Sequence, residues 1–334
     1  MENDKIDFVI PWVDGNDPDW IREFNKYSPN KKIFSEDLSK ERFRDYGLLR
    51  YWFRGVEKFA PWVNKVHFIT CGQKPEWLNL NAPKLNWVKH SDYIPKEYLP
   101  VFSSHPIELM MHKIPNLAEK IVYFNDDFFL TSPVRNKSFF KNNLPCDSAL
   151  LNAFCPDEFV SHVLVNDLKI INDRFSKKSV LKKNFLKWIN LKYGKSLIRT
   201  FCLLPCPDFT GIHVTHMPQP FLKSTLEEVW EKEKDILEKT MSHKFRDVSD
   251  VNQWLFRFWA LCKGQFVPVN PFKGKKYFSF DNSLKEISDA IRKQKYKEIV
   301  INDCGKNAID FERYMTEIAA AFEAILPEKS SFEL

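Results

Sequence analysis

The sequence predicts an α/β fold in which helices flank a mostly parallel central sheet. Short apolar runs bounded by turn residues alternate with longer segments of helical periodicity, which is typical of such folds. Several of these runs lack polar alternation, which indicates strands buried on both faces. The chain has 334 residues, 44% of them hydrophobic and 15% aromatic, so it can bury a large core and is not a disordered polymer.

The first strand is expected over residues 6–13, IDFVIPWV, because the turn formers DGNDPDW follow directly after it. A helix is expected over residues 42–62. Apolar or aromatic side chains recur there every three or four residues between Leu48 and Phe59. Pro61 ends this helix, because proline cannot continue the hydrogen-bond ladder.

Three further strands and a short helix are expected before residue 130. KVHFITCG at 65–72 and LNWVKH at 85–90 have strand patterns. SHPIELMMHKI at 104–114 predicts a short helix, since serine is a good cap and proline is tolerated in a first turn. The most apolar strand is IVYF at 121–124.

The second half of the chain repeats this pattern. KEIVIN at 297–302 predicts another buried strand, and the Trp-rich segment 251–262 a core helix. A further helix, amphipathic or buried, is expected over residues 308–326. The last residues, 328–334, are expected to form a frayed tail.

Two adjacent carboxylates interrupt the most apolar run of the chain, IVYFNDDFFL. Asn125, Asp126 and Asp127 follow the strand at its carboxyl end, where parallel sheets bind ligands. Two carboxylates and an amide offer the oxygen ligands that Mg²⁺ prefers, usually shared with substrate phosphates. A plain turn with a capping Asp is the alternative. Burying two carboxylates without a counter-charge is costly, which favours a functional site.

The same pattern recurs at two other strand ends. The strand at 297–302 ends in Asn302 and Asp303, and the first strand leads to Asp14, Asn16 and Asp17. Three strand ends that each deliver carboxylates suggest convergence around a cation and its phosphates. Ordinary turn chemistry at each end is the alternative, because the strand order cannot be read from the sequence.

Several basic side chains fit a phosphate site. Arg50 and Arg54 are four residues apart on one helix face, and Arg forks match phosphate oxygens, although a solvated helix surface is the favoured interpretation of any one of them. Glu108 and His112 have the same spacing. His216 precedes a proline-bearing loop, where a general base or a structural histidine can lie.

A zinc site is the competing interpretation of one segment. Cys202, Cys206, His213 and His216 are all possible zinc ligands. The spacer between the second Cys and the first His is too short for a zinc finger. If the two histidines lie on a strand they point to opposite faces, so the pattern does not favour zinc.

The net charge and the cysteine content indicate the kind of partner and the cellular compartment. The net charge of +6 suits an anionic substrate or surface. Seven scattered cysteines in a long chain indicate a reducing, cytoplasmic compartment. No apolar run of about 18 residues and no secretory signal can be read in the sequence.

One basic segment departs from the compact pattern. Residues 169–195 carry nine Lys or Arg and one Asp. Leu181, Phe185 and Trp188 recur there at helical spacing, which predicts a basic amphipathic helix. Such a helix can lie on an anionic membrane surface, so peripheral association with the inner membrane is open. A solvated helix with its apolar side on the core, or a contact with a polyanionic acceptor, is the alternative.

Blocks across most of the chain resemble the Stealth family of sugar-1-phosphate transferases. This family includes bacterial capsular polysaccharide hexose-1-phosphate transferases and the lysosomal-enzyme N-acetylglucosamine-1-phosphotransferase. The second and third blocks are long and specific. The blocks are IDFVIPWVDGNDPDW (6–20), the run from RFRDYGLLRYW to KPEWL (42–78), the run from SSHPIELMM to NDDFFL (103–130), and a fourth made of THMPQPF (215–221), KFRDVSDVNQWLFRFW (244–259) and IVINDC (299–304).

The resemblance implies a nucleotide-sugar-transferase (GT-A-like) core and a defined reaction. Sugar-1-phosphate moves from a UDP-N-acetylhexosamine to an acceptor hydroxyl of an oligosaccharide or capsular polymer. A phosphodiester forms and UMP leaves, with Mg²⁺ or Mn²⁺ as cofactor. The implied divisions are a nucleotide-sugar-binding half at 1–150, a basic helical insert at 151–205 and a second catalytic half at 206–334.

The resemblance also implies residue roles. Asp127, His216, Arg246 and Asp303 match catalytic positions, and Asp126, Asp127 and Asp303 are the expected metal ligands. Either His216 or Asp127 is the general base. The residues expected on the nucleotide-sugar side are Trp12, Val13, Asp14, Gly15, Asp45, Arg50 and Asn125.

Two other functions fit parts of the sequence. An ordinary metal-dependent glycosyltransferase would break the sugar–oxygen bond and release UDP. A non-catalytic polyanion-binding protein would use the basic segment and bind with strong salt dependence. The second leaves the acidic strand ends unexplained, and nucleic acid is not the expected partner.

Overall fold

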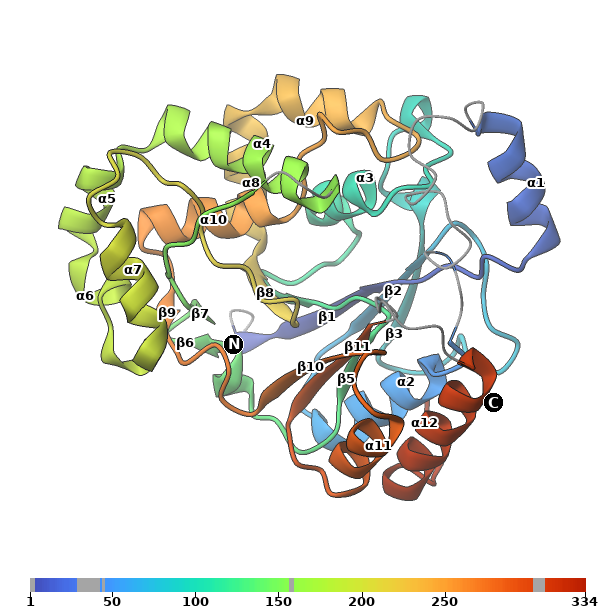
Figure 1. Ribbon diagram of the computed structural model, residues 1–334. Helices are drawn as coiled ribbons and strands as arrows, with labels where there is room; N and C mark the ends of the chain where they lie inside the picture. Colours follow the sequence, from blue (N-terminus) through green and yellow to red (C-terminus); the bar gives the residue numbers. More distant parts are fainter. Residues whose placement is uncertain (1–3, 29–42, 44–45, 156–158, 303–309) are drawn as a thin grey trace.

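A five-stranded sheet forms the centre of the molecule in the computed structural model, which describes residues 4–28, 43, 46–155, 159–302 and 310–334 (Figure 1). The strand order is β3–β2–β1–β4–β8; the first four strands are parallel, and β8 is antiparallel to β4. The predicted α/β class with a mostly parallel sheet is confirmed. The strands are β1 (Ile6–Pro11), β2 (Val66–Thr70), β3 (Leu85–Lys89), β4 (Lys120–Tyr123) and β8 (Gln219–Leu222).

The register brings the chemically interesting segments to one edge of this sheet. Val9 of β1 pairs with Tyr123 of β4, and Tyr123 pairs with Gln219 of β8. Because β8 runs in the opposite direction, its beginning lies at the carboxyl ends of the parallel strands. The turn after β4 and the segment before β8 therefore meet at that edge.

Two smaller sheets extend the core. The predicted strand at 297–302 exists as β11 (Glu298–Asn302), paired with parallel β10 (Lys275–Ser279) and with antiparallel β5 (Phe128–Leu130). Since β5 follows the Asp126–Asp127 turn directly, the end of β11 lies beside that turn. The third sheet consists of β6 (Phe140–Lys141), β7 (Leu144–Asp147) and β9 (Val267–Pro268).

Helices cover both faces of the central sheet (Figure 1). Phe8 and Val9 are neighbours in β1, yet they belong to two different hydrophobic clusters, one on each face. This explains the continuous apolar strands. The first cluster includes side chains of α2 (Leu49–Phe59), α11 (Leu284–Arg292) and α12 (Phe311–Ile325). The second includes side chains of α3 (Ser104–Leu109), α4 (Phe159–Arg174), α8 (Lys223–Lys232), α9 (Lys234–Met241) and α10 (Trp254–Lys263).

Several predicted helices are shorter in the structure. Helix α2 begins at Leu49, just after Gly47 with φ of 67°, and ends before Pro61. Helix α3 ends at Leu109, and a 3-10 turn continues it. Helix α1 spans Pro18–Tyr27. The 3-10 turns in the described part of the chain are His90–Asp92, Lys96–Tyr98, Met111–Lys113, Asn136–Ser138 and Leu191–Ser196.

The prediction of one amphipathic helix over residues 169–195 is wrong. Helix α4 ends at Arg174, and Ser176 caps a new helix, α5 (Lys177–Lys183). Two short helices follow, α6 (Phe185–Trp188) and, after a 3-10 turn, α7 (Leu197–Leu203). Capping serine and Gly194, with φ of 55°, break the segment, because both favour non-helical backbone.

The expected frayed tail at the chain end is also wrong. Phe332 is 1% exposed, and Glu333 accepts hydrogen bonds of 2.8 and 2.9 Å from the guanidinium of Arg54. Arg54, which the sequence offered as a phosphate fork, is itself buried and also donates to the carbonyl of Leu326. The tail therefore anchors α2, and Arg54 has a structural role.

Candidate active site

The candidate site lies in the turn between β4 and β5, at the carboxyl edge of the central sheet. Oδ2 of Asp127 accepts a 2.9 Å hydrogen bond from Nδ2 of Asn302 and lies 3.2 Å from Nε2 of His216. These residues come from the turn after β4, the end of β11 and the segment before β8. Two of the three expected strand ends therefore meet, and the sequence-predicted His216 joins them.

The second oxygen of this carboxylate is available to a ligand. Oδ1 of Asp127 is buried and has no hydrogen-bond partner among the described residues. A buried carboxylate oxygen without a partner is costly, and a hard cation such as Mg²⁺ or Mn²⁺ would satisfy it. Asp126 next to it is exposed. Asp303 lies outside the described residues, and the described part of the expected ligand set fits such a cation.

His216 is the accessible member of the pair. Its side chain is 40% exposed, whereas that of Asp127 is 7% exposed. Partial burial lowers the pKa of His216, but the charge of Asp127 and its hydrogen bond raise it more, and Asp126 and Glu108 raise it further. The net pKa of His216 therefore lies above its ordinary value. The ring of Tyr277 on β10 lies 5.9 Å away.

Glu108 on α3 is a third carboxylate of this region. Its Oε1 accepts a 2.9 Å hydrogen bond from the hydroxyl of Tyr123, the last residue of β4. Its Oε2 is buried without a partner among the described residues. The expected helical pairing with His112 fails because α3 ends first. Burial lowers the pKa of His112 to about 4, and its ring packs 5.6 Å from Trp230.

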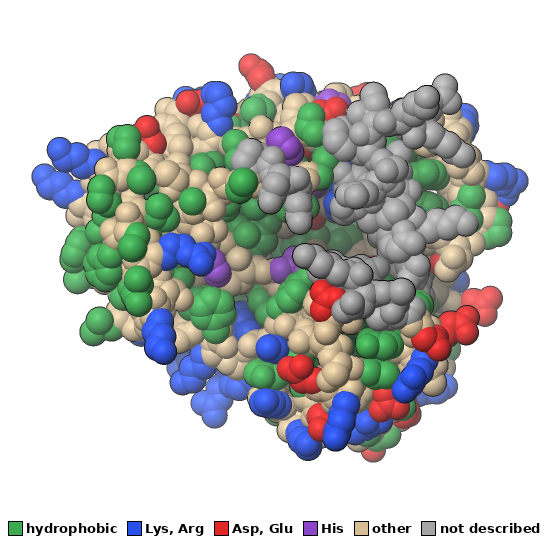
Figure 2. Space-filling model, viewed as in Figure 1, with side chains coloured by type: hydrophobic (Ala, Val, Ile, Leu, Met, Phe, Trp, Pro, Cys, Tyr) green, Lys and Arg blue, Asp and Glu red, His purple; other side chains and the backbone are tan. Residues whose placement is uncertain are grey.

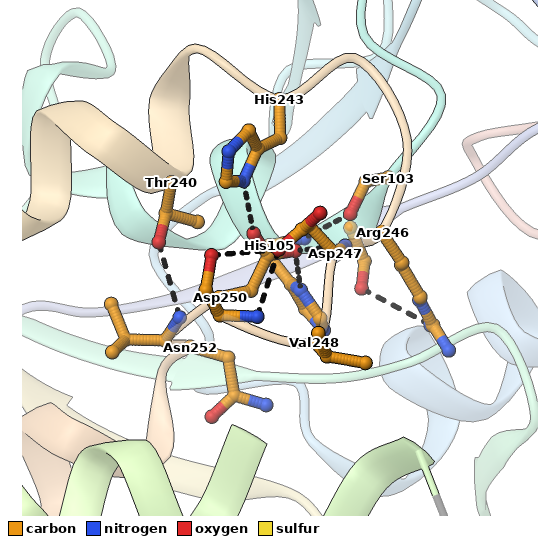
Figure 3. Close-up of polar contacts among 12 residues, drawn as sticks. Ser103, His105, Thr240, His243, Arg246, Asp247, Val248, Asp250 and Asn252 are labelled. Atoms are coloured by element: carbon orange, nitrogen blue, oxygen red, sulfur yellow. Dashed lines mark hydrogen bonds and ion pairs between the residues drawn. The ribbon is translucent and has the colours of Figure 1, made fainter. Parts of the chain in front are cut away.

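A buried hydrogen-bond network organises the loop after α9 (Figure 3). Asp250 is 0% exposed; its Oδ1 lies 2.7 Å from Nδ1 of His243, and its Oδ2 lies 2.8 Å from Nδ1 of His105. Oδ2 also accepts the backbone N–H of Asp247. His243, Asp247 and Asp250 offer ligand atoms within 4.8 Å of one another. Both oxygens of Asp250 have hydrogen-bond partners, and these contacts hold the loop.

The same loop carries Arg246. In Figure 3 its side chain extends away from the network, and Nη2 donates to Oγ of Ser104, the first residue of α3, at 3.5 Å. His105, on the same helix, anchors Asp250. The guanidinium is therefore held beside the helix that also carries Glu108.

The acidic residues after β1 form their own turn. The amide of Gln73 exchanges two hydrogen bonds with the backbone of Asp14 and donates a third, of 2.9 Å, to Oδ2 of Asp17. Asp17 also caps α1. A side chain at Gly15 would meet the carbonyl of Phe43 at 2.3 Å, so glycine is required there. These carboxylates line the same sheet edge as Asp127 but have local partners.

The other residues expected on the nucleotide-sugar side differ in how exposed they are. Trp12 is 8% exposed and belongs to the core, and Val13 is half-buried. Arg50 is exposed, with its guanidinium over the ring of Trp77 at 5.8 Å. Asn125 is half-buried, and its carbonyl accepts the backbone N–H of Phe128. Asp45 lies outside the described residues.

The unfavoured zinc interpretation gains no support. His216 is engaged by Asp127, and the ring of His213 packs 5.8 Å from Phe272. Within the described ranges, the one His/Cys/Asp/Glu group with ligand spacing is that around Asp250.

Three family models match the chain. The Stealth protein conserved region 1 matches residues 4–32, conserved region 2 matches 42–147, and conserved region 3 matches 215–256. These regions contain Asp127, His216 and Arg246. This chain belongs to the Stealth protein family. Region 2 covers what the sequence presented as two separate blocks, and IVINDC lies beyond the matched residues.

Relatives of this Stealth protein match over the full length. The chain is 44% identical to the capsular polysaccharide phosphotransferase WcwK of Streptococcus pneumoniae, covering 100% of this chain and 99% of the relative. It is 43% identical to the receptor polysaccharide phosphotransferase WefC of Streptococcus gordonii, covering 99% of each. It is 39% identical to the exopolysaccharide phosphotransferase cps2G of Lactiplantibacillus plantarum, over 98% and 96%. The chain is therefore a transferase of the phosphotransferase type.

Some residues of this Stealth site escaped sequence reasoning. Tyr277 contacts His216 from a strand that the sequence did not predict. His105, His243 and Asp250 are distant in sequence, so their mutual contacts had no local pattern. Glu108 was noticed only as half of a helical pair; a carboxylate flanked by Ile107 and Leu109 was the better signal.

Proposed function

We propose that this chain transfers a hexosamine-1-phosphate unit from a UDP-N-acetylhexosamine to a sugar hydroxyl of a capsular or other surface polysaccharide. The acceptor oxygen forms a bond to the phosphorus that carries the sugar, and the bond from this phosphorus to the bridging oxygen breaks. A phosphodiester forms, UMP leaves, and the hydroxyl proton passes to the enzyme. The names of the full-length relatives support the polysaccharide acceptor.

The observation that carries this proposal is the Asp127–His216 pair, in which one ring nitrogen is engaged and one carboxylate oxygen has no partner among the described residues. Asp127 fixes Nε2 of His216, so Nδ1 is the nitrogen that exchanges a proton with the acceptor hydroxyl or the leaving phosphate. A pKa raised by the neighbouring carboxylates suits such proton exchange near neutral pH. We assign to Arg246, whose guanidinium is held beside Ser104, the neutralisation of charge that develops on the non-bridging oxygens.

Asp127, together with Asp126 and Asp303, would hold a Mg²⁺ or Mn²⁺ ion. When bound, this ion would neutralise charge on the diphosphate. The buried Oδ1 of Asp127 supports this assignment, because nothing in the described chain satisfies it. The charge of Glu108 adds to that of the two aspartates in raising the pKa of His216.

Product analysis tests the reaction. The full chain is incubated with Mg²⁺, UDP-N-acetylglucosamine or UDP-N-acetylmannosamine, and an oligosaccharide acceptor, and UMP is separated from UDP by anion exchange. We expect UMP in amounts that depend on acceptor and on Asp127. UDP as the product would instead establish an ordinary glycosyltransferase. Salt-sensitive polyanion binding that persists in Asp127→Asn, without either product, would favour the binding-protein alternative.

We also propose that the enzyme works in the cytoplasm against the membrane surface. No helix in the described part of the chain is long and apolar enough to cross a bilayer. Large apolar side chains nevertheless protrude from α6, α7 and the turn between them, beside the exposed Lys182 and Lys183 (Figure 2, left edge). They are Phe185 (55% exposed), Leu186 (76%), Leu191 (92%), Ile198 (66%) and Phe201 (51%).

Vesicle flotation tests this docking surface. Apolar tips surrounded by lysines suit an anionic bilayer, where the tips enter the interface and the lysines meet lipid phosphates. We expect the chain to float with vesicles of anionic lipid and not with neutral ones. Leu186→Glu with Leu191→Glu should abolish flotation without loss of turnover on a water-soluble acceptor. Unchanged flotation in that variant would remove the membrane proposal.

A further inference from the structure

A cavity of about 710 Å³ borders the candidate active site on the side of β6, β7 and β10. Its lining includes Thr215, the residue before His216, and Pro218 shortly after it. Lys275 on β10 also lines it, two residues before Tyr277, whose ring contacts His216. The volume is in the range of pockets that hold small ligands. The cavity is therefore close enough to the reacting groups to hold part of a substrate.

The lining is strongly basic. Figure 2 shows Lys and Arg side chains gathered at the lower left, where Figure 1 places β6, β7 and β10. The lining lysines come from separate segments of the chain. They are Lys137, Lys141, Lys192, Lys273, Lys275 and Lys297.

The acids of the lining neutralise only one of these lysine charges among the described residues. Asp147 is bound by the guanidinium of Arg257, through contacts of 2.8 and 2.9 Å. Glu298 is paired with Lys275 at 2.8 Å. For the other five lysines, no carboxylate among the described residues lies within the 4.0 Å of an ion pair.

Clustered ammonium groups repel one another, and a concave wall focuses their field. An anionic ligand relieves that repulsion. Lysine suits phosphate as a mobile point charge that does not impose one orientation. A second cavity of about 380 Å³ is also lined by Lys137 and Lys141, together with Asn142 and Asn143, so the two cavities are neighbours. We refer to the two as the lysine-lined trough; side by side, they suit an extended chain better than a single small molecule.

We propose that this lysine-lined trough binds a phosphodiester already present in the acceptor glycan, beside the sugar hydroxyl that attacks at His216. This rests on the proposed function, because that reaction makes a polymer whose repeats carry phosphodiesters. The enzyme then recognises its acceptor through a phosphodiester that an earlier transfer formed. The donor diphosphate occupies a different place, at the Asp126–Asp127 turn.

The test compares two acceptors of the same sugar sequence, one with an internal phosphodiester and one with a neutral methylphosphonate in its place. Lys137→Glu with Lys273→Glu reverses charge in the trough. Lys96→Glu with Lys285→Glu, at two exposed lysines outside the trough and the docking surface, is the matched control with the same change of net charge. We expect the trough variant to raise KM for the phosphodiester acceptor about tenfold. The KM values for the neutral acceptor and for the donor should stay within about twofold, and the control should behave as wild type.

Equal KM values of wild type for both acceptors, or an equal rise for the neutral acceptor or the donor, would overturn the proposal. Calorimetric titration of the phosphodiester glycan without donor separates this result from failure of the proposed function. Binding that the trough variant loses and the control keeps supports the trough even if no UMP forms. Binding that inorganic phosphate or UMP displaces equally well would indicate a general anion site and contradict recognition of the glycan.

Discussion

The central sheet carries an aspartate–histidine pair at each end, and the two pairs differ in how completely they are satisfied. At the amino ends of the strands, Oδ2 of Asp7 lies 2.9 Å from Nε2 of His67, and both side chains are at most 1% exposed. At the carboxyl edge, Asp127 and His216 are 3.2 Å apart, and the histidine side chain is 40% exposed.

The remaining partners explain the difference. Oδ1 of Asp7 accepts from the side chain of Asn64 and the backbone of Lys65, and Oδ2 also accepts from the backbone of Ala118. Both side-chain oxygens of Asp7 therefore link the start of β1 to the segments that lead into β2 and β4. Asp127 has a second oxygen with no partner among the described residues. The same two residue types therefore fasten the sheet at one end and leave bonding capacity for a ligand at the other.

The largest expected effect is a loss of turnover on substitution of Asp127 that substitution of Asp7 does not cause. Asp127→Asn should lower turnover about 10³- to 10⁴-fold, because it removes both the charge that orients His216 and a cation ligand. Its thermal unfolding should stay close to wild type, since Asn keeps the shape and the contact with Asn302 can persist. Turnover with each donor and scanning calorimetry measure the two quantities.

Asp7→Asn is the matched control at the other end of the sheet. It makes the same chemical change but should keep turnover per folded molecule within about threefold. Similar losses of turnover in both variants would mean that the pairs do not differ in role, and the site assignment would have to be abandoned.

The histidines give the second comparison. His216→Gln should lower turnover about 10²- to 10⁴-fold if the ring exchanges a proton with substrate. His67→Gln should leave turnover per folded molecule nearly unchanged and lower the unfolding temperature instead. A His216→Gln enzyme that retains more than a tenth of wild-type turnover would leave His216 only a positioning role.

The sequence revealed one of these pairs and hid the other, for a physical reason. Asp127 stands out because two acids end an apolar strand, and local context makes burial of their charge costly. Asp7 sits inside the first strand, where one acid in an apolar run shows no partner. His67 lies 60 residues away. Only the parallel register of β1 and β2 brings the two together.

The same limit explains the errors on the basic segment and on the chain end. The spacing of Leu181, Phe185 and Trp188 predicted one helix over 169–195, yet the helix breaks depend on local caps and on burial of Trp188, which is 0% exposed. Glu333 anchors to Arg54 across 279 residues. Alternating strands and helices were readable because they follow from periodicity. Contacts between distant segments, including the lysine-lined trough, were not.

A smaller effect concerns stability. Asp7→Asn should lower the free energy of unfolding by about 3–5 kcal/mol, the usual consequence of removing one partner of a buried pair. Asp127→Asn should change it by less than about 1 kcal/mol, because Asp127 has fewer satisfied contacts to lose. Urea unfolding at neutral pH, followed by tryptophan fluorescence, gives both values.

The smallest expected effect is the pH dependence of the difference in unfolding free energy between wild type and Asp7→Asn. Burial alone raises the pKa of Asp7, but the hydrogen bonds from His67 and Asn64, the charge of His67 and the N–H of Ala118 lower it more, so the net pKa lies below its ordinary 3.8. A lowered pKa means that the folded state holds Asp7 ionised more strongly than the unfolded state does. The stabilisation is therefore fully present above the ordinary pKa and is lost as the pH falls through the lower, folded-state value.

The greater stability of wild type over Asp7→Asn should therefore disappear in acid. The gap between their urea midpoints should be constant from about pH 7 to pH 5 and should narrow progressively below about pH 4. Taking the difference between the two proteins cancels other acids, such as Glu333, whose pKa is also lowered, here chiefly by the hydrogen bond from Arg54 against the opposing effect of burial. A gap that widens in acid would reverse the sign of the coupling. The charge of Asp7 would then be a cost to the sheet, and the contrast between its two ends would need another cause.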